Sequence, residues 1–411
     1  MTFNHYKMKE LISDISMGPF GSNIKTDCYQ ESGVPYLNGS NLMGVTLVED
    51  KFNYISEEKA NELGRAVAQR GDVIVTHRGT LGQISYIPPT SKYKRYVTGN
   101  SQFRFSCNKL LLPEYIVYYF HSRKGQHTLL SNSSRVGVPA LARPTSSFQT
   151  LDVEIPDVDT QKRIVKILSS LDAKIELNNK INANLQQQAQ ALFKSWFVDF
   201  EPWGGVMPEG WRESTLSECT SLIAKGITPS YAEESDQIVI NQKCIRNHQI
   251  NLDLAKRHKP KLINDKWVSY GDILINSTGV GTLGRSAQVY FTSDKITVDS
   301  HVTIVRPCSA ELIPFLGLLL IGSESLFVSM QSGSTGQTDL PRERLFNMPL
   351  ILPDKDTLTD FASLVTPIIN STVVYQNENR HLAELRDTLL PKLMSGELDV
   401  SDIELSEVSD A

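Results

Sequence analysis

The feature that most constrains this chain is an internal repeat. Residues 71–87 read GDVIVTHRGTLGQISYI, and residues 271–290 read GDILINSTGVGTLGRSAQVY. The Gly-Asp pair and the Gly-Thr-Leu-Gly tetrapeptide recur at offsets of 200 and 202 residues, because the second copy carries two extra residues between them. A period of this length is far longer than a solenoid unit, so it predicts a duplicated domain.

The repeat extends through the chain of 411 residues. Further matches join residues 100–102 to 299–301, Gly137, Leu141 and Arg143 to Gly336, Leu340 and Arg342, and residues 155–157 to 352–354. Each half begins with short β-branched and aromatic runs broken by Gly, Pro and Asn, such as 72–77 and 272–277. These runs predict strands and tight turns, and they are followed by helical stretches at 113–130 and 313–330.

Each half ends in a long stretch with apolar residues at alternating spacings of three and four. The first runs from Thr160 to Val198 and the second from Leu358 to Met394. Both stretches share one register at an offset of 197 residues, and Asn182 and Asn379 occupy the same seam position. We predict two long helices that form a coiled coil, with the asparagines fixing its register. Two separate amphipathic helices on separate cores are the alternative.

The composition indicates a globular protein without membrane or secretion signals. No apolar run reaches the roughly 18 residues of a membrane span, and the N-terminal MTFNHYKMKE lacks the apolar core of a signal peptide. The five cysteines are scattered and form no Cys-x-x-Cys pair. We therefore expect reduced thiols, no metal site and a cytoplasmic protein.

The net charge of −5 hides two basic segments. Residues 65–146 hold 12 Lys and Arg against two acids, and residues 243–306 hold 10 against five. Residues 354–411, in contrast, hold 12 Asp and Glu against four Lys and Arg. One basic segment can be a merely solvated surface, but two at matching places in a repeat indicate a shared polyanionic partner.

Motifs for enzymatic chemistry are absent or incomplete. Residues 279–284 satisfy G-x-G-x-x-G, but the following RSAQVYF reads as a strand, whereas a nucleotide-binding loop needs a helix there. The Pro-Pro pair at 88–89 lacks the polar residue and the aromatic that a DNA methyltransferase tetrapeptide would bring. The eight histidines show no metal-ligand spacing, and acids are scarce in the basic segments. We expect a binding protein with no catalytic residue and no bound cofactor.

Four segments carry a resemblance to a known family. AQALFKSWFVDFEP (189–202), LRDTLLPKLMSGEL (385–398), MGPFGSNIK (17–25) and GSTGQTDLPRERL (333–345) resemble the specificity subunit of Type I restriction-modification enzymes. The order of parts, with each variable domain followed by a long helix, resembles it too.

The resemblance implies an α+β fold with an internal pseudo-two-fold repeat. Two similar, β-rich target recognition domains would each read one half of a bipartite, non-palindromic site on double-stranded DNA. The long helices would form an antiparallel coiled coil that sets the spacing and docks two methyltransferase subunits, and separate subunits would supply restriction and translocation. S-adenosylmethionine, ATP and Mg would belong to these partner subunits. The expected parts are domain 1 (1–156), helix 1 (157–200), a linker (201–211), domain 2 (212–353), helix 2 (354–396) and an acidic tail (397–411).

Candidate DNA contacts follow from side-chain chemistry. Arg suits guanine and Asn or Gln suits adenine, whereas lysines and arginines along a basic segment suit phosphates. The predicted base-reading residues are Arg78, Asn100, Gln102, Arg135, Asn276, Arg285, His301 and Gln337. The predicted phosphate contacts are Lys92, Lys94, Arg95, Arg104, Lys243, Arg246, Lys256, Arg257, Lys259 and Lys261. Each of these could instead cap a turn or hold a strand.

Two other classes of function remain open at this point. One is a self-sufficient DNA methyltransferase or nuclease, which the missing motifs disfavour. The other is a scaffold whose coiled coil joins two protein-binding domains.

Overall fold

The structure is a computed structural model that describes residues 1–403 except 132, 135–137, 262 and 334–337. Contacts divide it into two compact units. Unit 1 combines residues 1–176 with residues 379–411, and unit 2 comprises residues 177–378. Each unit is described by itself below.

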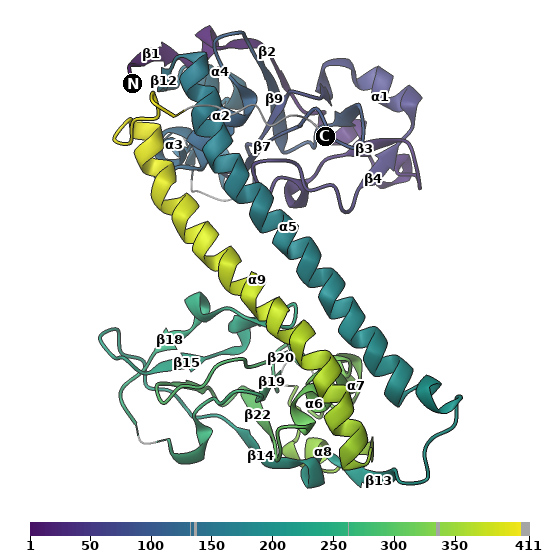
Figure 1. The fold of residues 1–411 in the computed structure, drawn as a ribbon. Coiled ribbons are helices and arrows are strands. Elements are labelled where there is room, and N and C mark those ends of the chain that lie inside the picture. Colours follow the sequence, from purple (N-terminus) through teal and green to yellow (C-terminus); the bar gives the residue numbers. More distant parts are fainter. Residues whose placement is uncertain (132, 135–137, 262, 334–337, 404–411) are drawn as a thin grey trace. The chain divides into compact units, whose positions relative to one another are not determined.

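Unit 1 is built on two four-stranded sheets and a two-stranded ribbon (Figure 1). The first sheet is antiparallel, in the order β2-β9-β6-β7, and the second, in the order β4-β3-β8-β5, contains the parallel pair β3 and β8. The ribbon pairs β1 with β12, and a short pair joins β10 to β11. The strands are β1 (Phe3–Lys7), β2 (Ile12–Met17), β3 (Val34–Tyr36), β4 (Asn53–Ile55), β5 (Val67–Gln69), β6 (Val73–Thr76), β7 (Ile84–Tyr86), β8 (Arg95–Val97), β9 (Gln102–Cys107), β10 (Ser133–Ser134), β11 (Ala140–Leu141) and β12 (Asp152–Pro156).

Four short helices complete the domain of unit 1: α1 (Glu57–Leu63), α2 (Pro113–His121), α3 (Arg123–Leu130) and α4 (Pro144–Gln149). Proline at the first position starts both α2 and α4, where its missing N–H leaves no hydrogen bond unmade. Phe103 and Phe105 of β9 pack on Phe148 of α4, with ring centroids 5.2 and 5.0 Å apart. The predicted helical stretch 113–130 is thus two helices, broken at Ser122, whose hydroxyl caps the second.

Unit 2 repeats this topology (Figure 1). Its antiparallel sheet runs β14-β22-β19-β20, its second sheet runs β18-β15-β21 with β15 and β21 parallel, and β13 pairs with β23. The elements that both units share follow in the same order along the chain, which confirms the predicted duplication. Among its described residues, unit 2 has no α-helix in the place of α1 and no strand in the place of β5, and it adds the hairpin β16-β17. The strands are β13 (Arg212–Thr215), β14 (Thr220–Lys225), β15 (Ile238–Ile240), β16 (Ile245–Arg246), β17 (Gln249–Ile250), β18 (Lys256–Arg257), β19 (Ile273–Asn276), β20 (Ser286–Gln288), β21 (Ile296–Val298), β22 (Val302–Pro307) and β23 (Pro349–Leu352). The short helices are α6 (Leu312–Ile321), α7 (Glu324–Ser329) and α8 (Arg342–Phe346).

The alignment of residues 100–102 with 299–301 is wrong by one position. The N–H of Gly18 donates to the carbonyl of Gln102 (2.8 Å), and the N–H of Gly226 donates to that of Val302 (3.0 Å). Gln102 and Val302 are therefore equivalent, as the first residues of β9 and β22. The equivalent of His301 is then Ser101. Backbone hydrogen bonds set this register, whereas the sequence comparison matched a serine that lies one position away.

The repeated Gly-Asp pair shapes a turn and a buried charge. Gly271 adopts φ +90°, and Oδ2 of Asp272 accepts a hydrogen bond from the N–H of Ser269 (2.8 Å). Asp272 is fully buried and binds the guanidinium of Arg306 through both oxygens, at 2.7 and 2.8 Å. In unit 1, Asp72 makes the same turn contact with Gln69. This part of the frame recurs because it holds the strands together.

The two long helices are α5 (Val158–Phe197) and α9 (Lys355–Ser395), and they pack antiparallel within each unit. In unit 1, Ile164 and Leu168 near the start of α5 share one core with Leu390 and Leu393 near the end of α9. In unit 2, residues 189–193 near the end of α5 share a core with residues 358–369 near the start of α9. The prediction of two long helices that pack against each other is confirmed.

Both long helices begin at the same capping motif. In α5, Asp157 accepts hydrogen bonds from the N–H groups of Asp159 and Thr160 (both 3.0 Å) and from the Thr160 hydroxyl (2.8 Å). In α9, Asp354 binds the N–H (2.9 Å) and hydroxyl (2.8 Å) of Thr357. The matched residues 155–157 and 352–354 therefore run from the end of a strand to the residue that caps the following helix, where the carboxylate of Asp157 or Asp354 satisfies otherwise unpaired amides.

Aromatic packing holds the chain between α5 and β13. The rings of Trp211 and Trp203 meet edge to face, with centroids 5.1 Å apart, and Nε1 of Trp211 donates to Asp354 (3.1 Å). At the other end of the chain, the N-terminal ammonium lies 2.8 Å from Asp399, and Val400 is buried in the core of unit 1. The described part of the acidic segment, residues 397–403, therefore packs on unit 1.

None of the helices within the described residues is long and apolar enough to cross a bilayer.

Candidate nucleic-acid interface

Three loops meet at one end of the antiparallel sheet in each unit. In unit 1, the N–H of His77 donates to Ser101 (2.9 Å), and the N–H of Leu141 donates to His77 (2.9 Å). In unit 2, the N–H of Ser277 donates to the carbonyl of His301 (2.8 Å), and the N–H of Leu340 donates to the carbonyl of Ser277 (2.7 Å). The loop after β6 or β19, the turn before β9 or β22 and the segment near residue 140 or 340 thus form one surface, which we call the loop face.

A fourth segment, which we include in the loop face, has the same turn in both units. The Asn38 side chain caps a one-turn 3-10 helix at residues 39–41, and the Asn241 side chain caps its counterpart at residues 242–244. This equivalence places Gly39 of unit 1 at the position of Gln242 of unit 2. Gly39 lies beside Gln83, whereas Gln242 donates through Nε2 to the carbonyl of Thr278 (2.9 Å). The backbone repeats here, but the side chain changes.

The candidate residues of unit 1 differ in accessibility. Arg78 is exposed and bridges Ala140 through its backbone, and Asn100 is exposed on the turn before β9. Gln102 is buried, with 2% of its surface exposed, and its Oε1 accepts from the N–H of Gly99 (2.8 Å). A contact between Gln102 and a base would require that hydrogen bond to break. Arg135 lies outside the described residues.

The candidate residues of unit 2 show the same division. Asn276 is fully buried and donates through Nδ2 to the carbonyl of Gln242 (3.1 Å). Arg285 is half-buried and donates to the carbonyl of Gly281 (2.8 Å). His301 is exposed, and its Nδ1 lies 2.9 Å from the hydroxyl of Thr278. Gln337 lies outside the described residues.

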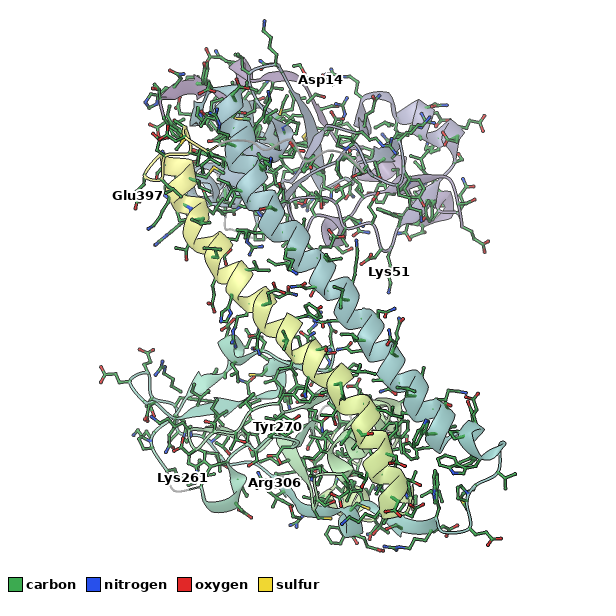
Figure 2. All side chains as sticks on the ribbon, viewed as in Figure 1. Asp14, Lys51, Lys261, Tyr270, Arg306 and Glu397 are labelled. Atoms are coloured by element: carbon green, nitrogen blue, oxygen red, sulfur yellow. The ribbon has the colours of Figure 1, made fainter. Side chains whose placement is uncertain are left out.

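Most of the predicted phosphate contacts are exposed. In unit 1, Lys92 and Lys94 are exposed, while Arg95 is half-buried, bonds to Asn61 (2.7 Å) and pairs with Glu57 of α1. In unit 2, the exposed candidates are Lys243, Arg246, Lys256, Arg257, Lys259 and Lys261, the last of which is labelled in Figure 2.

Local structure positions two of the exposed basic side chains of unit 2, Arg246 and Lys256. A hairpin of β16 and β17 presents Arg246, and its two-residue turn, Asn247 and His248, has φ values of +52° and +58°. Both residues therefore adopt the left-handed conformation that tight hairpins require. The ammonium of Lys256 lies 4.6 Å from the ring centroid of Tyr231.

Arg104 differs from the other phosphate candidates because it is buried. Its guanidinium lies 2.8 Å from Asp14 and 3.4 Å from Asp72, and its Nε donates to the carbonyl of Arg65 (2.9 Å). Burial works against ionisation of Asp14, yet the hydrogen bond from Arg65 and the charge of Arg104 hold its pKa below the ordinary value. In this arrangement Arg104 neutralises two carboxylates inside unit 1, and a phosphate would have to displace them.

The asparagines of the helix seam are placed as follows. Asn182 is buried, and its Oδ1 has no hydrogen-bond partner within the described residues. Asn379 is half-buried. Polar pairs join the helices in each unit: Asn178 donates to Glu378 in unit 2 (2.8 Å), and Arg386 pairs with Asp172 in unit 1 (2.8 Å). The role of Asn182 and Asn379 in the register stays a prediction.

Sequence reasoning missed Gln242 and Thr278. Neither stands out by type, and their contacts with each other and with His301 join residues that are distant in sequence. The signal was present in the repeat, because three equivalent positions on the loop face carry different residues: Gly39 and Gln242, Arg78 and Thr278, Ser101 and His301.

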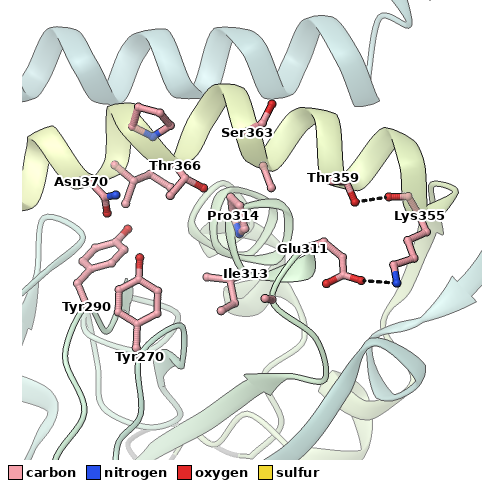
Figure 3. A pocket seen from close by; sticks show the side chains of 14 residues that line it. Tyr270, Tyr290, Glu311, Ile313, Pro314, Lys355, Thr359, Ser363, Thr366 and Asn370 are labelled. Carbon is pink, nitrogen blue, oxygen red and sulfur yellow. Dashed lines mark hydrogen bonds and ion pairs between the residues drawn. The ribbon is translucent and has the colours of Figure 1, made fainter.

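A cavity of about 650 Å³ lies away from the loop face, in unit 2 between Tyr270, Tyr290 and helix α9, with the ion pair of Glu311 and Lys355 (3.6 Å) at its edge (Figure 3). None of the described candidate residues lines it. In the part of the chain that the structure describes, no cluster of three or more His, Cys, Asp or Glu suits a metal ion.

Comparison with known proteins gives a consistent result. Residues 12–187 match a family model described as a Type I restriction modification DNA specificity domain. The "Type I restriction enzyme MjaIX specificity subunit" of Methanocaldococcus jannaschii is 26% identical over 95% of this chain and 93% of its own length. The "Type I restriction enzyme HindI specificity subunit" of Haemophilus influenzae is 24% identical over 94% of this chain and 99% of its own length.

The fold is similar to a solved structure over nearly the entire chain. The S subunit of a Type I restriction-modification system from M. genitalium superposes with a TM-score of 0.61, at 15% identity, and covers 96% of both chains. This likeness supports the α+β architecture with two long helices.

Proposed function

Since the chain belongs to the family of Type I restriction-modification specificity subunits, we propose that it recognises DNA sequence for a Type I restriction-modification complex. Each unit reads one half of a bipartite, non-palindromic target through its loop face. The observation that carries this proposal is the loop face itself. Its backbone recurs in both units, while the side chains change at Gly39/Gln242, Arg78/Thr278 and Ser101/His301. A repeated frame with different reading residues is what two unequal half-sites require.

The exposed lysines and arginines give each unit its sequence-independent affinity. Their contacts with phosphates position the protein but do not specify a base. Arg78, Asn100 and His301 are the exposed members of the base-reading set. Arg135 and Gln337 remain proposed members of that set.

The chain acts by aiming other subunits. Its partners are double-stranded DNA, methyltransferase subunits and restriction subunits, and the reactive groups lie on those subunits. S-adenosylmethionine, ATP and Mg bind there, and this chain itself is not catalytic. The proposed location is the cytoplasm, where the DNA is. Helices α5 and α9 set the separation of the two half-sites.

The main test is methylation mapping with a domain exchange. The full chain is expressed with its methyltransferase partner, and methylated sites are mapped across the genome by sequencing. Residues 1–153 are then replaced by those of a relative with another target. We expect one half of the target to change and the other to stay. A change in both halves would show that the units do not read independently, and no sequence-specific methylation by the parent would overturn the proposal.

A second test addresses the spacing. Four residues, close to one helical turn, are inserted into α5 near Gln187. The preferred separation of the half-sites is expected to change while both half-site sequences stay. If the separation is unchanged, the helices do not set it.

A further inference from the structure

A chain of hydrogen bonds in unit 2 ends at the exposed imidazole of His301. The Nε2 of Gln242 donates to the carbonyl of Thr278 (2.9 Å) and also to the Thr278 hydroxyl. That hydroxyl lies 2.9 Å from Nδ1 of His301. The backbone of this turn is fixed by a further hydrogen bond, from the N–H of His301 to Oδ1 of Asp299 (2.9 Å).

The orientation of the Gln242 amide is determined by its neighbours. The carbonyl of Thr278 can only accept, so the atom that contacts it must be the NH₂ group. The other end of the amide points to Gly279, where an added Cβ would lie 2.8 Å from Oε1. Gly279 also has φ +97°. Glycine at this position therefore leaves room for Gln242 to reach Thr278.

The direction of the next hydrogen bond fixes the tautomer of His301. The Thr278 hydroxyl accepts from Gln242 and has one hydrogen to donate. If that hydrogen is donated to Nδ1 of His301, which lies 2.9 Å away, Nδ1 is the acceptor and the proton of the neutral imidazole sits on Nε2. The exposed edge of His301 then presents an N–H donor.

We propose that this relay makes His301 a reader of base edges that accept a hydrogen bond. The inference rests on the proposed function and deepens it. In the major groove, guanine offers N7 and O6, adenine offers N7 and thymine offers O4, whereas cytosine offers a donor. One position of the half-site read by unit 2 therefore carries guanine, adenine or thymine on the contacted strand, and cytosine is rejected there. Gln242 and Thr278 are positioning residues, since they act through His301.

Unit 1 supports the assignment by its difference. The positions of Gln242, Thr278 and His301 are occupied there by Gly39, Arg78 and Ser101, which cannot form this relay. The capping turns that carry Gly39 and Gln242 are alike. The relay is thus an addition to the shared frame rather than part of it, as expected for a residue set that determines specificity.

The test uses the full chain in complex with its methyltransferase partner. The parent target is first mapped by methylation sequencing. Competition binding at one salt concentration then compares duplex oligonucleotides in which each base pair of the half-site is substituted singly. The variants are His301→Ala, Thr278→Val, Thr278→Ser and His301→Glu. Thr359→Val is the matched control, because Thr359 is an exposed threonine on α9 whose hydroxyl donates to the carbonyl of Lys355 (2.9 Å).

We expect His301→Ala to lower discrimination at one position by roughly 10- to 100-fold. Thr278→Val should relax the same position, and Thr278→Ser should retain the parent preference because it keeps the hydroxyl. A variant that combines His301→Ala with Thr278→Val should discriminate no worse than His301→Ala alone, since both changes interrupt one pathway. His301→Glu should favour cytosine at that position, because a carboxylate accepts from its amino group. Thr359→Val should match the parent.

Several results would overturn the inference. Each of the first three results below contradicts the relay alone, because a sequence-specific target mapped for the parent still supports the proposed function. One is unchanged discrimination in His301→Ala, and another is equal loss on all sequences, which would mark a phosphate contact. Relaxation of different positions by His301→Ala and Thr278→Val would break the relay. A parent that shows no sequence preference would instead refute the proposed function, and the inference with it.

Discussion

Replacement of Arg104 by methionine tests whether this residue binds DNA or holds unit 1 together. Arg104 is 9% exposed, and its side chain binds Asp14, Asp72 and the carbonyl of Arg65. Arg104→Met keeps much of the apolar stem but removes the cation. Asp72, which is 6% exposed, would remain buried beside no guanidinium.

The expected loss of stability follows from the partners that remain. Breaking one side of a buried ion pair costs about 3–5 kcal/mol. Asp72 keeps the N–H of Gln69 (2.9 Å) and the hydroxyl of Ser106, and its distance to Arg104 is already 3.4 Å. We therefore place Arg104→Met near 3 kcal/mol. Arg306→Met should cost about 4–5 kcal/mol, because Asp272 is fully buried and bound through both oxygens.

Urea unfolding of the full chain can distinguish the two variants. The four tryptophans, Trp196, Trp203, Trp211 and Trp267, all lie in unit 2. Tryptophan fluorescence should therefore report the loss in Arg306→Met, and far-UV circular dichroism should report the loss in Arg104→Met. Lys94→Met changes an exposed side chain and should stay within about 0.5 kcal/mol of the parent.

DNA binding supplies the refutation. If Arg104 is structural, the salt dependence of affinity in Arg104→Met should match the parent under conditions where the protein is folded. If instead the urea midpoint stays unchanged and the salt slope falls by about one unit, Arg104 contacts a phosphate. The reasoning from burial would then be wrong.

Three further predictions follow from the packing. Asp157→Ala should cost about 1 kcal/mol through loss of the α5 cap, whereas Asp157→Asn should keep most of it. Hydrogen bonds from Thr160 lower the pKa of Asp157 in the folded protein. The carboxylate therefore stabilises the fold above its unfolded pKa of about 3.9, and this stabilisation is lost as the pH falls through the lower folded pKa. Unfolding measured over an acid pH series should show the loss of stability in the parent and not in Asp157→Ala. Tyr118→Phe should cost about 1–2 kcal/mol by removing the donor to Asp172 (2.6 Å), with no change in the methylated sequence. Phe361→Ala should cost about 3–5 kcal/mol, visible by tryptophan fluorescence, because its fully buried ring packs 4.6 Å from that of Phe197.

Much of the architecture was predictable from local pattern. Residues 160–198 were predicted as a helix and form α5 over Val158–Phe197, because apolar spacing reports a helical face within a few turns. The glycines at 279–284 were predicted as turns, and β20 follows them at Ser286. The contacts of single side chains were less predictable. By type, Gln102 was predicted to read a base and Arg104 to contact a phosphate, and the fold buries both.

The sequence by itself determined that this chain is two copies of one domain, each followed by a long helix. Periodicity and repetition are properties of order along the chain, so they can be read without coordinates. Only the tertiary structure decided which side chains of the repeat face solvent. It brought Gln242, Thr278 and His301 into one relay. It also showed that Ser101 is the residue of unit 1 equivalent to His301. Such contacts join residues more than 20 positions apart, and the packing of whole loops, rather than any local preference, determines them.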